Sequence, residues 1–452
     1  MTELHTPDWL ADAIFYQIFP DRFANGDPGL DPEGVVAWDA APTPDNFFGG
    51  DLAGIVSRLD HLVELGVTAL YLTPVFEART NHRYDAVDYF RIDHRLGTLD
   101  DFRRFLSAAH DRGIRVVLDG VFNHAGVGHA AFRDIVEREE ESRWVNWFSV
   151  EGFPVVSHPV PNYRTCSGCW YLPKWNVHNP EVRAHHLAVA RHWIAEGIDG
   201  WRLDVPYFVQ RGFWRQFREV VKGESDDLYI VAEEWRDPDE WLRGDMADGT
   251  MNYTLRDLIL GFTADGSIDA YAFAAGVEAL HARIPEPARP AMLNLLGSHD
   301  TERVLTRHGD DVPALLCAYA LLFAAQGAPM IYYGDEVGLR GANDPGCRGG
   351  MVWDTARWEP AIHEAVVRWT SLRRRLESLR RGAQRVVALA PDVVAVTRAH
   401  ADEVTVVVVN RGTAAFAMTR DEAERHGLRF VGEDGLRVPG RGSVVSVDGV
   451  IE

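Results

Sequence analysis

The sequence contains little that would place the protein outside the soluble globular class. Only four cysteines occur among 452 residues, too few for a disulfide framework, and no run reaches the ~18 apolar residues of a membrane span. The first residues have neither a basic start nor an apolar signal core. Lysine and arginine number 46 against 67 acidic residues, so the formal charge of −21 argues against nucleic acid and anionic membranes as partners. We expect a soluble, cytoplasmic protein.

The glycine-rich phosphate turn of a doubly wound nucleotide-binding sheet is also missing, because Phe19-Pro20-Asp21 follows the first predicted strand. Apolar strand-like segments instead alternate with amphipathic helical ones. Strands are expected at residues 13–20, 67–74, 115–122, 197–205, 228–235, 250–253, 291–298 and 328–334. The clearest helices are expected at residues 54–66, 99–113, 180–196, 212–222, 271–283, 312–326 and 362–381. Eight strand–helix units with buried apolar strands predict an α/β fold, the (β/α)8 TIM barrel.

Two segments depart from this alternation. Residues 125–178 are rich in aromatic residues, proline and glycine without a clear period, which predicts a small subdomain inserted after strand three. Residues 383–452 change to period-two runs without helices, which predicts a C-terminal antiparallel β-sandwich. The barrel would then comprise residues 1–124 and 179–382.

Polar residues cluster where the predicted strands end, the part of a TIM barrel that carries the chemistry. They are Asp119, Asn123, His124, Arg202, Asp204, Glu233, His299 and Asp300. A single Arg-x-Asp pair such as Arg202 and Asp204 is most simply a structural ion pair. A whole set of acids, histidines and an arginine at one barrel mouth is hard to explain structurally, because buried unpaired carboxylates are costly.

Glycoside hydrolysis is a reaction that needs two carboxylates from neighbouring strands. Adjacent strands lie about 4.8 Å apart, so Asp204 and Glu233 can reach the ~5–5.5 Å separation of a retaining pair. Alternation along the strand puts Arg202 on the side of Asp204, where it would keep that carboxylate ionised and nucleophilic. Glu233 would then be the proton donor, and Asp300 with His299 would grip the sugar hydroxyls.

These residues form four motifs that resemble those of the α-amylase superfamily of glycoside hydrolases. The motifs are Asp119-Gly-Val-Phe-Asn123-His124, Gly200-Trp-Arg202-Leu-Asp204, Glu233 within Ile-Val-Ala-Glu-Glu-Trp, and Gly297-Ser-His299-Asp300. The resemblance implies that Asp204 is the nucleophile, Glu233 the acid/base and Asp300 the transition-state stabiliser. It also implies substrate binding by Tyr84, Asp119, His124, Arg202 and His299.

Leu172-Pro-Lys174-Trp175-Asn176 is similar to a segment of the cyclomaltodextrinase, neopullulanase and maltogenic amylase subgroup. This implies a small α-glucan substrate, cyclic or linear, cut at α-1,4 bonds to maltose-sized products. Trp175, Glu234, Gly349 and Gly350 differ from the subgroup pattern, and we expect them, with Lys174, to shape the acceptor side, as for a cyclic maltosyl-maltose.

Two other activities fit the same fold. The first is an α-glucan transglycosylase or isomerase, and the second is a non-catalytic carbohydrate-binding protein, against which the three acids Asp204, Glu233 and Asp300 argue. Because the barrel is expected to start near Trp9, we expect no counterpart of the N-terminal β-domain that helps to build the dimer of the subgroup. A homodimer therefore remains an open expectation.

Hard oxygen ligands at close spacing resemble the calcium loop of the subgroup. They are Asn25, Asp27, Asp31, Gly49 and Asp51. Leu30 replaces an asparagine ligand, and an Asx-rich turn without metal is the alternative. Calcium would be structural, since the retaining mechanism needs no metal. Cys166 and Cys169 form a C-x-x-C pair. The alternatives for these two cysteines are free thiols, a local disulfide and zinc binding.

Overall fold

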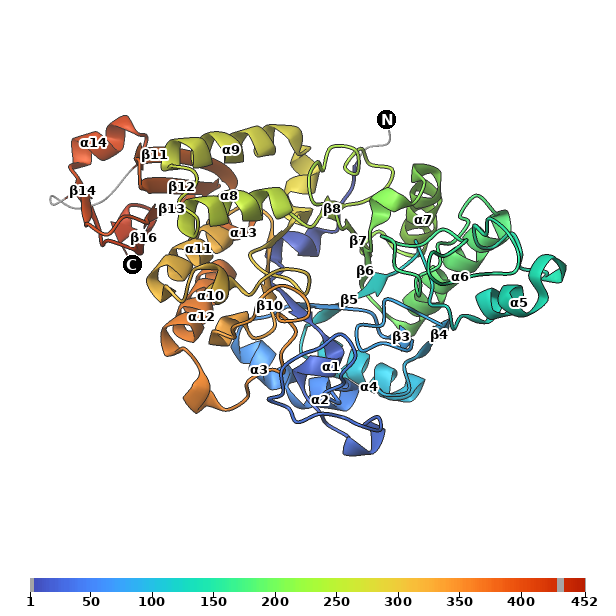
Figure 1. The fold of residues 1–452 in the computed structure, drawn as a ribbon. Helices are drawn as coiled ribbons and strands as arrows, with labels where there is room; N and C mark the ends of the chain where they lie inside the picture. The colour runs from blue at the N-terminus through green and yellow to red at the C-terminus, as the bar shows by residue number, and fades with distance from the viewer. Residues whose placement is uncertain (1–3, 429–434, 452) are drawn as a thin grey trace.

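The computed structural model describes residues 4–428 and 435–451 and contains a barrel of eight parallel strands (Figure 1). Neighbouring strands pair in the order β8-β7-β6-β5-β2-β1-β10-β9. Their bounds are β1 Phe15–Ile18, β2 Ala69–Leu72, β5 Arg115–Gly120, β6 Gly200–Leu203, β7 Tyr229–Ala232, β8 Gly249–Thr250, β9 Leu293–Leu295 and β10 Ala328–Tyr332. The predicted TIM barrel is confirmed, and all eight strands lie within or next to the expected segments.

The barrel closes through a weak seam. Strand β8 has two residues, which explains its faint sequence signal, and it pairs with β7 on one side. On the other side a single parallel bridge joins Met251 to Leu293 of β9. Side chains support this seam: Asn252 Nδ2 donates to Asn294 Oδ1 at 2.8 Å, and Tyr229 donates its hydroxyl to the Ala291 carbonyl at 2.6 Å.

Helices cover the outside of the barrel. Their bounds are α1 Pro20–Phe23, α2 Leu52–Ser57, α3 Leu59–Glu64, α4 Leu99–His110, α6 Pro180–Glu196, α7 Arg211–Glu224, α8 Tyr253–Thr263, α9 Ala270–Arg283, α10 Val304–Arg307, α11 Val312–Ala324, α12 Pro360–Arg375 and α13 Glu377–Arg381. Short 3-10 turns lie at Asp8–Asp12, Pro28–Leu30, Glu139–Glu141, Pro206–Phe208, Glu286–Ala291, Asp335–Val337 and Thr355–Arg357. None of the described helices is both long and apolar enough to cross a membrane.

Local sequence signals explain several helix ends. Thr98 and Asp101 form a capping box at the start of α4, and Asn179 with Pro180 starts α6. Gly197 ends α6 in the left-handed region at φ 105°, where a side chain would be strained. Two single helices expected from the sequence are each two helices in the structure. Arg58 leaves helical geometry between α2 and α3, and Leu376 is extended between α12 and α13.

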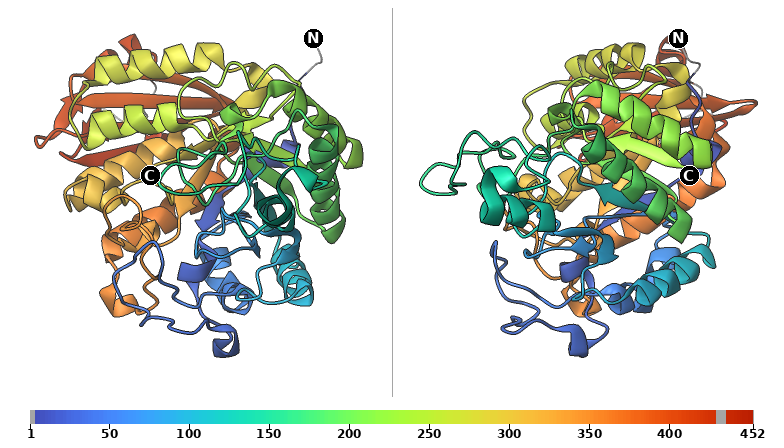
Figure 2. Two further views of the ribbon diagram at one scale, coloured as in Figure 1. Left: turned by 45° about the vertical axis from the view of Figure 1, so that its right-hand side comes forward. Right: turned by 90° about the vertical axis from the view of Figure 1, so that its right-hand side faces the viewer.

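The insertion projects from the barrel mouth at the end of the molecule opposite the C-terminal sheet (Figure 2). It follows β5 and contains helix α5, Ala130–Arg138, which the sequence analysis did not predict. A short antiparallel pair, β3 Phe76–Glu77 and β4 Asp88–Ile92, comes before it in the chain. Aromatic side chains fill the subdomain, with Phe148 stacked on Trp175 at 4.3 Å between ring centroids.

The C-terminal region forms an antiparallel sheet of five strands, β11-β12-β13-β16-β17, and a two-stranded sheet, β14-β15. The bounds are β11 Ala383–Ala390, β12 Val393–His400, β13 Glu403–Asn410, β14 Phe416–Met418, β15 Leu436–Val438, β16 Gly442–Val447 and β17 Val450–Ile451. The expectation that this region has no helix was wrong, because Thr419 and Glu422 form a capping box that starts α14, Arg420–Arg425.

Candidate active site

One buried arginine joins the carboxylates at the ends of three adjacent strands. Arg202 Nη1 donates to Asp119 at 2.9 Å and to Asp204 Oδ1 at 2.9 Å, and its Nη2 lies 3.0 Å from Glu233 Oε1. The register pairs Asp119 with Arg202 and Leu203 with Ala232, so β5, β6 and β7 end side by side. Asp204 and Glu233 thus contact different nitrogens of one guanidinium, which is compatible with the ~5–5.5 Å spacing of a retaining pair.

Glu233 is held from two further directions. Its Oε2 accepts the backbone N–H of Val205 at 2.8 Å, and its Oε1 accepts the indole N–H of Trp235 at 3.1 Å. Val205 has a positive φ of 34°, a strained conformation for a β-branched residue. Trp235 is itself stacked on Tyr253 with 3.7 Å between ring centroids. The side chain of Glu233 is therefore fixed in place before any ligand binds.

Tyr84 forms a platform beside the carboxylates. Its hydroxyl donates to Asp119 Oδ2 at 2.8 Å, and its ring lies parallel to the ring of His299 with 5.5 Å between centroids. The other face of the network is fixed by Gln17, whose Nε2 lies 2.7 Å from His299 Nδ1. His124 and Tyr84 line one cavity with the carboxylates, and the buried His124 Nε2 has no hydrogen-bond partner among the described residues. That nitrogen is available to a ligand hydroxyl.

Asp300 follows β9 and completes the acid set across the barrel mouth. Its Oδ2 lies 3.2 Å from His299 Nε2, and its Oδ1 lies 3.2 Å from Arg348 Nη2. Arg348 also pairs with Asp344 at 2.9 Å. Both residues belong to the loop at residues 343–351, which was expected from its departures at Gly349 and Gly350 to influence specificity. Asp344 and Arg348 themselves were not predicted as site residues.

These groups line a cavity of about 460 Å3. Its lining includes Asp204, Glu233 and Asp300 with His82, Tyr84, His124, Cys166, Ser167, Cys169, Tyr171, Leu172, Val205, Tyr207, Trp235, Asp344 and Arg348. A volume of this size holds a small ligand, and the walls combine flat rings with carboxylates and donors.

Burial dominates the electrostatics of the cavity. It raises the pKa of Glu233 and raises that of Asp204 well above its usual range, and Asp300 raises both further. Arg202 opposes the shift in each case but faces three carboxylates with one charge. Burial and the neighbouring carboxylates therefore favour a state in which one member of the Asp204–Glu233 pair keeps its proton while the other is ionised, as one acid and one base require. Burial also lowers the pKa of His124 to about 3, so its ring is neutral.

Comparisons with known proteins agree with this geometry. A family model described as the catalytic domain of alpha amylase matches residues 17–388. The chain belongs to the α-amylase family of glycoside hydrolases. It is 61% identical to the solved ligand-free cyclic α-maltosyl-(1→6)-maltose hydrolase of Arthrobacter globiformis, with a TM-score of 0.95 over 98% of this chain and 99% of that one.

Curated relatives point to the expected subgroup. A cyclomaltodextrinase of Geobacillus thermopakistaniensis is 43% identical over 90% of this chain and 70% of that protein. Neopullulanase 2 of Thermoactinomyces vulgaris is 46% identical over 83% of this chain and 65% of that protein. The chain thus spans about two thirds of the length of these curated relatives.

The residues expected to shape the acceptor side lie in different places. Lys174 is half-buried and donates to the Phe208 carbonyl at 2.8 Å, beside a neighbouring cavity that also includes Tyr207. Glu234 lies outside the cavity of the carboxylates, and its Oε2 accepts from the Trp241 indole at 2.8 Å. Trp175 is 2% exposed within the inserted subdomain, so it presents almost no surface to a sugar.

Gly349 and Gly350, which were expected to shape the acceptor side, are not among the residues that line the cavity of the carboxylates. The Gly349 carbonyl accepts the Tyr333 hydroxyl at 2.6 Å. A Cβ on Gly350 would lie 2.5 Å from the Trp38 carbonyl oxygen, so the chain approaches residue 350 too closely for any side chain. Residue 350 is therefore a glycine because the loop at residues 24–50 packs against it.

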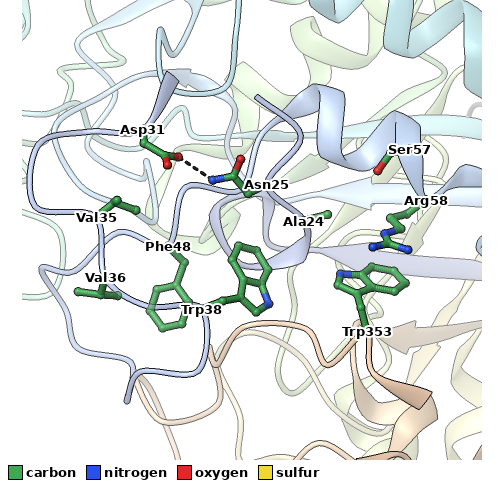
Figure 3. Close-up of a pocket in the computed structure, with 10 residues that line it drawn as sticks. All are labelled: Ala24, Asn25, Asp31, Val35, Val36, Trp38, Phe48, Ser57, Arg58 and Trp353. Atoms are coloured by element: carbon green, nitrogen blue, oxygen red, sulfur yellow. Dashed lines mark hydrogen bonds between the residues drawn. The ribbon is translucent and has the colours of Figure 1, made fainter. Parts of the chain in front are cut away.

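That loop contains the residues expected to bind calcium, and hydrogen bonds within the protein engage their polar groups. Asn25 turns its amide nitrogen toward Asp31 Oδ1 at 2.7 Å, as Figure 3 shows. Asp51 is fully buried and accepts from the backbone N–H groups of Gly26, Asp27 and Gly54. Asp27 caps the turn at Pro28–Leu30 through the Gly29 N–H. Among the described residues no group of three acidic, histidine or cysteine side chains could hold a metal.

The C-x-x-C pair forms a tight turn at the cavity wall. The Cys169 N–H donates to the Cys166 carbonyl at 2.9 Å, and Ser167 and Gly168 both have positive φ. Both cysteines are unbridged in the structure. Burial raises the pKa of the Cys166 thiol to about 11, so it is protonated and a poor nucleophile near neutral pH.

Proposed function

We propose that the protein hydrolyses small α-glucans built from maltosyl units, with cyclic α-maltosyl-(1→6)-maltose as the preferred substrate. The single observation that carries this is the shared guanidinium: Arg202 contacts both Asp204 and Glu233 at the wall of a small cavity. Supporting it, a solved relative 60% identical to this chain is a cyclic α-maltosyl-(1→6)-maltose hydrolase in complex with that sugar.

In the proposed reaction Asp204 attacks the anomeric carbon while Glu233 gives its proton to the leaving oxygen. Arg202 binds the carboxylate of Asp204 in the ionised form, and Val205 N–H and Trp235 hold Glu233 in position. Water then hydrolyses the glycosyl–enzyme bond with Glu233 as base. Asp300 and the neutral ring of His299 would hold hydroxyls of the same sugar, and Tyr84 would support its face.

The bond that is cut follows from the chemistry of the substrate. A ring of two maltose units joined by 1→6 bonds yields maltose only if those bonds are broken. The sequence analysis expected α-1,4 cleavage, which applies to cyclodextrins and linear maltooligosaccharides. We propose that the 1→6 bonds of the cyclic tetrasaccharide are cut by the same pair of carboxylates.

The deciding experiment is a product profile on cyclic maltosyl-maltose, cyclodextrin, pullulan, starch and maltotriose. Maltose as the main product of the cyclic tetrasaccharide, released faster than products of the other sugars, is the expected result. Longer glucans as the main products at high substrate concentration would instead indicate a transglycosylase. NMR of the first product should show the α-anomer, and initial release of the β-anomer would exclude the double displacement.

A further inference from the structure

A second cavity of about 380 Å3 lies apart from the carboxylates, between the loop at residues 24–50 and the segment around Trp353 (Figure 3). Its lining residues are Ala24, Asn25, Asp31, Val35, Val36, Trp38, Phe48, Ser57, Arg58 and Trp353. None of them lines the cavity of the carboxylates. The volume falls within the range of small-molecule sites, which begins at about 300 Å3.

The apolar walls of this second cavity are rigid aromatic rings. Trp38 donates its indole N–H to the Met351 carbonyl at 2.8 Å, and Trp353 donates to the Phe23 carbonyl at 2.7 Å. Both indole N–H groups are thus used by the backbone, so the rings are fixed and offer apolar surface. Phe48 packs edge-on against Trp38. Flat, preorganised rings of this kind lose little conformational entropy when a ligand covers them.

Polar groups surround these rings. The guanidinium of Arg58 lies over the Trp353 ring, 4.2 Å from its centroid, and it has no carboxylate partner among the described residues. Asp31 and Asn25, which bond each other at 2.7 Å, lie on another wall, and Ser57, whose hydroxyl donates to the Gly54 carbonyl at 2.7 Å, offers its oxygen as an acceptor (Figure 3). One cation and one anion leave the lining close to neutral. A neutral ligand that combines apolar faces with hydroxyl groups satisfies both the rings and the polar groups.

One wall of the cavity depends on Gly350, a position where this chain differs from the subgroup pattern. Gly350 allows the Trp38 carbonyl to approach to 2.5 Å of where a Cβ would stand, and Phe48 lies at 3.2 Å from the same point. A side chain at residue 350 could not share that space with Trp38 and Phe48. This glycine therefore permits the packing of the two rings that line the second cavity.

We propose that this second cavity is a carbohydrate-binding site that holds one maltosyl unit of an α-glucan. The choice of an α-glucan rests on the proposed function, whereas the presence of a sugar site rests on the rings and polar groups of the cavity. Maltose is the probe. The protein used is the full chain with Glu233→Gln, in which turnover of sugar should be slower by at least about a thousandfold.

Calorimetric titration of this protein with maltose should give two sites per chain. Adding Arg58→Ala, which removes an exposed side chain, should weaken one site about tenfold, and Trp38→Ala should weaken it at least as much. Arg143→Ala is the matched control, because the Arg143 guanidinium also covers an indole ring, that of Trp144, at 3.9 Å but outside this cavity. It should leave both sites unchanged.

A single maltose per chain would overturn the proposal, as would two sites that survive both Arg58→Ala and Trp38→Ala. Displacement of maltose from the Arg58-dependent site by millimolar inorganic phosphate would also overturn it, because the cavity would then be an anion site. Turnover of cyclic maltosyl-maltose by protein with Glu233 intact is measured separately. Loss of the proposed function would appear in that assay alone, and failure of the second site would appear in the titration alone.

Discussion

At the residue scale, Asp204 should be required for the rate of hydrolysis and should also lower the free energy of unfolding. Asp204→Asn and Glu233→Gln should each reduce kcat by at least about a thousandfold, with maltose still bound, because each removes one member of a unit that acts together. Initial rates on the cyclic tetrasaccharide measure this effect. Near-normal turnover in either variant would refute the assignment of these two carboxylates.

The Asp204→Asn variant should also stabilise the fold at neutral pH. Burial raises the pKa of Asp204, so ionising this carboxyl costs more free energy in the folded protein than in the unfolded chain. Stability therefore falls as pH rises, and an asparagine escapes this loss. Asp204→Asn should add about 1–2 kcal/mol to the free energy of unfolding at pH 7 and less at pH 5. The exposed Asp60→Asn is the control, and destabilisation of Asp204→Asn at pH 7 would contradict the prediction.

At the scale of elements, helix α6 contains a buried histidine that should make the fold acid-sensitive. His186 packs among aromatic residues, with 5.2 Å between its ring centroid and that of Phe122, and both ring nitrogens lack partners. Burial lowers its pKa well below 6.5, so the unfolded chain binds a proton that the folded chain does not. Stability is complete above about pH 6.5 and declines as pH falls below it.

Replacing His186 tests whether this residue makes the free energy of unfolding fall as the pH falls. His186→Leu should flatten the loss of unfolding free energy between pH 6.5 and pH 5 by up to about 1.4 kcal/mol per pH unit. Urea unfolding at several pH values measures the slope. The half-buried His192 on the same helix is the control position, and His192→Leu should change the slope less. An unchanged slope in His186→Leu would exclude His186 as the source.

The loop at residues 24–50 should keep its structure without metal. The carboxylate of Asp51 already accepts three backbone N–H groups, and Asn25 pairs with Asp31. We expect EDTA to leave the unfolding temperature unchanged and added calcium to raise it by less than about one degree. A ligand that binds only the folded chain at a hundred times its Kd adds about 2.7 kcal/mol, so a calcium site would produce a clear increase. Such an increase would restore the metal expected from the sequence.

At the scale of the whole molecule, hydrogen bonds to backbone carbonyls hold the C-terminal sheet to the barrel. Arg411 donates to the carbonyls of Phe262 and Ile268, and the Ala270 N–H donates to the Pro391 carbonyl at 2.8 Å. Arg398 is buried and donates to the Ala324 carbonyl at 2.9 Å. These bonds join α8, α9 and α11 to the sheet, so the two parts share one buried boundary.

Features that depend on neighbouring residues could be predicted from the sequence, whereas features that depend on contacts between distant residues could not. Strand ends and their polar residues are local, so Asp119, Arg202, Asp204 and Glu233 could be assigned to one barrel mouth. Glycine is needed at position 350 because the Trp38 carbonyl, more than 300 residues away in the sequence, approaches it closely. No local sequence pattern predicts that contact. The packing of Phe148 on the Trp175 ring likewise depends on the fold of the inserted subdomain, and no local sequence pattern predicts it. Helix α8 was missed because it follows the two-residue strand β8.

The seam between β8 and β9 should open more often than the fully paired strands on the other side of the barrel. Amide hydrogens of Met251 and Leu293 should exchange with deuterium faster than those of Val117 and Trp201, which lie in fully paired strands. Hydrogen-exchange mass spectrometry measures the difference, and equal protection would contradict it. Asp300 follows β9 while Glu233 follows β7, so opening of the seam separates these two acids. Arg202 and Asp204, which share β6 and its end, stay together during that motion.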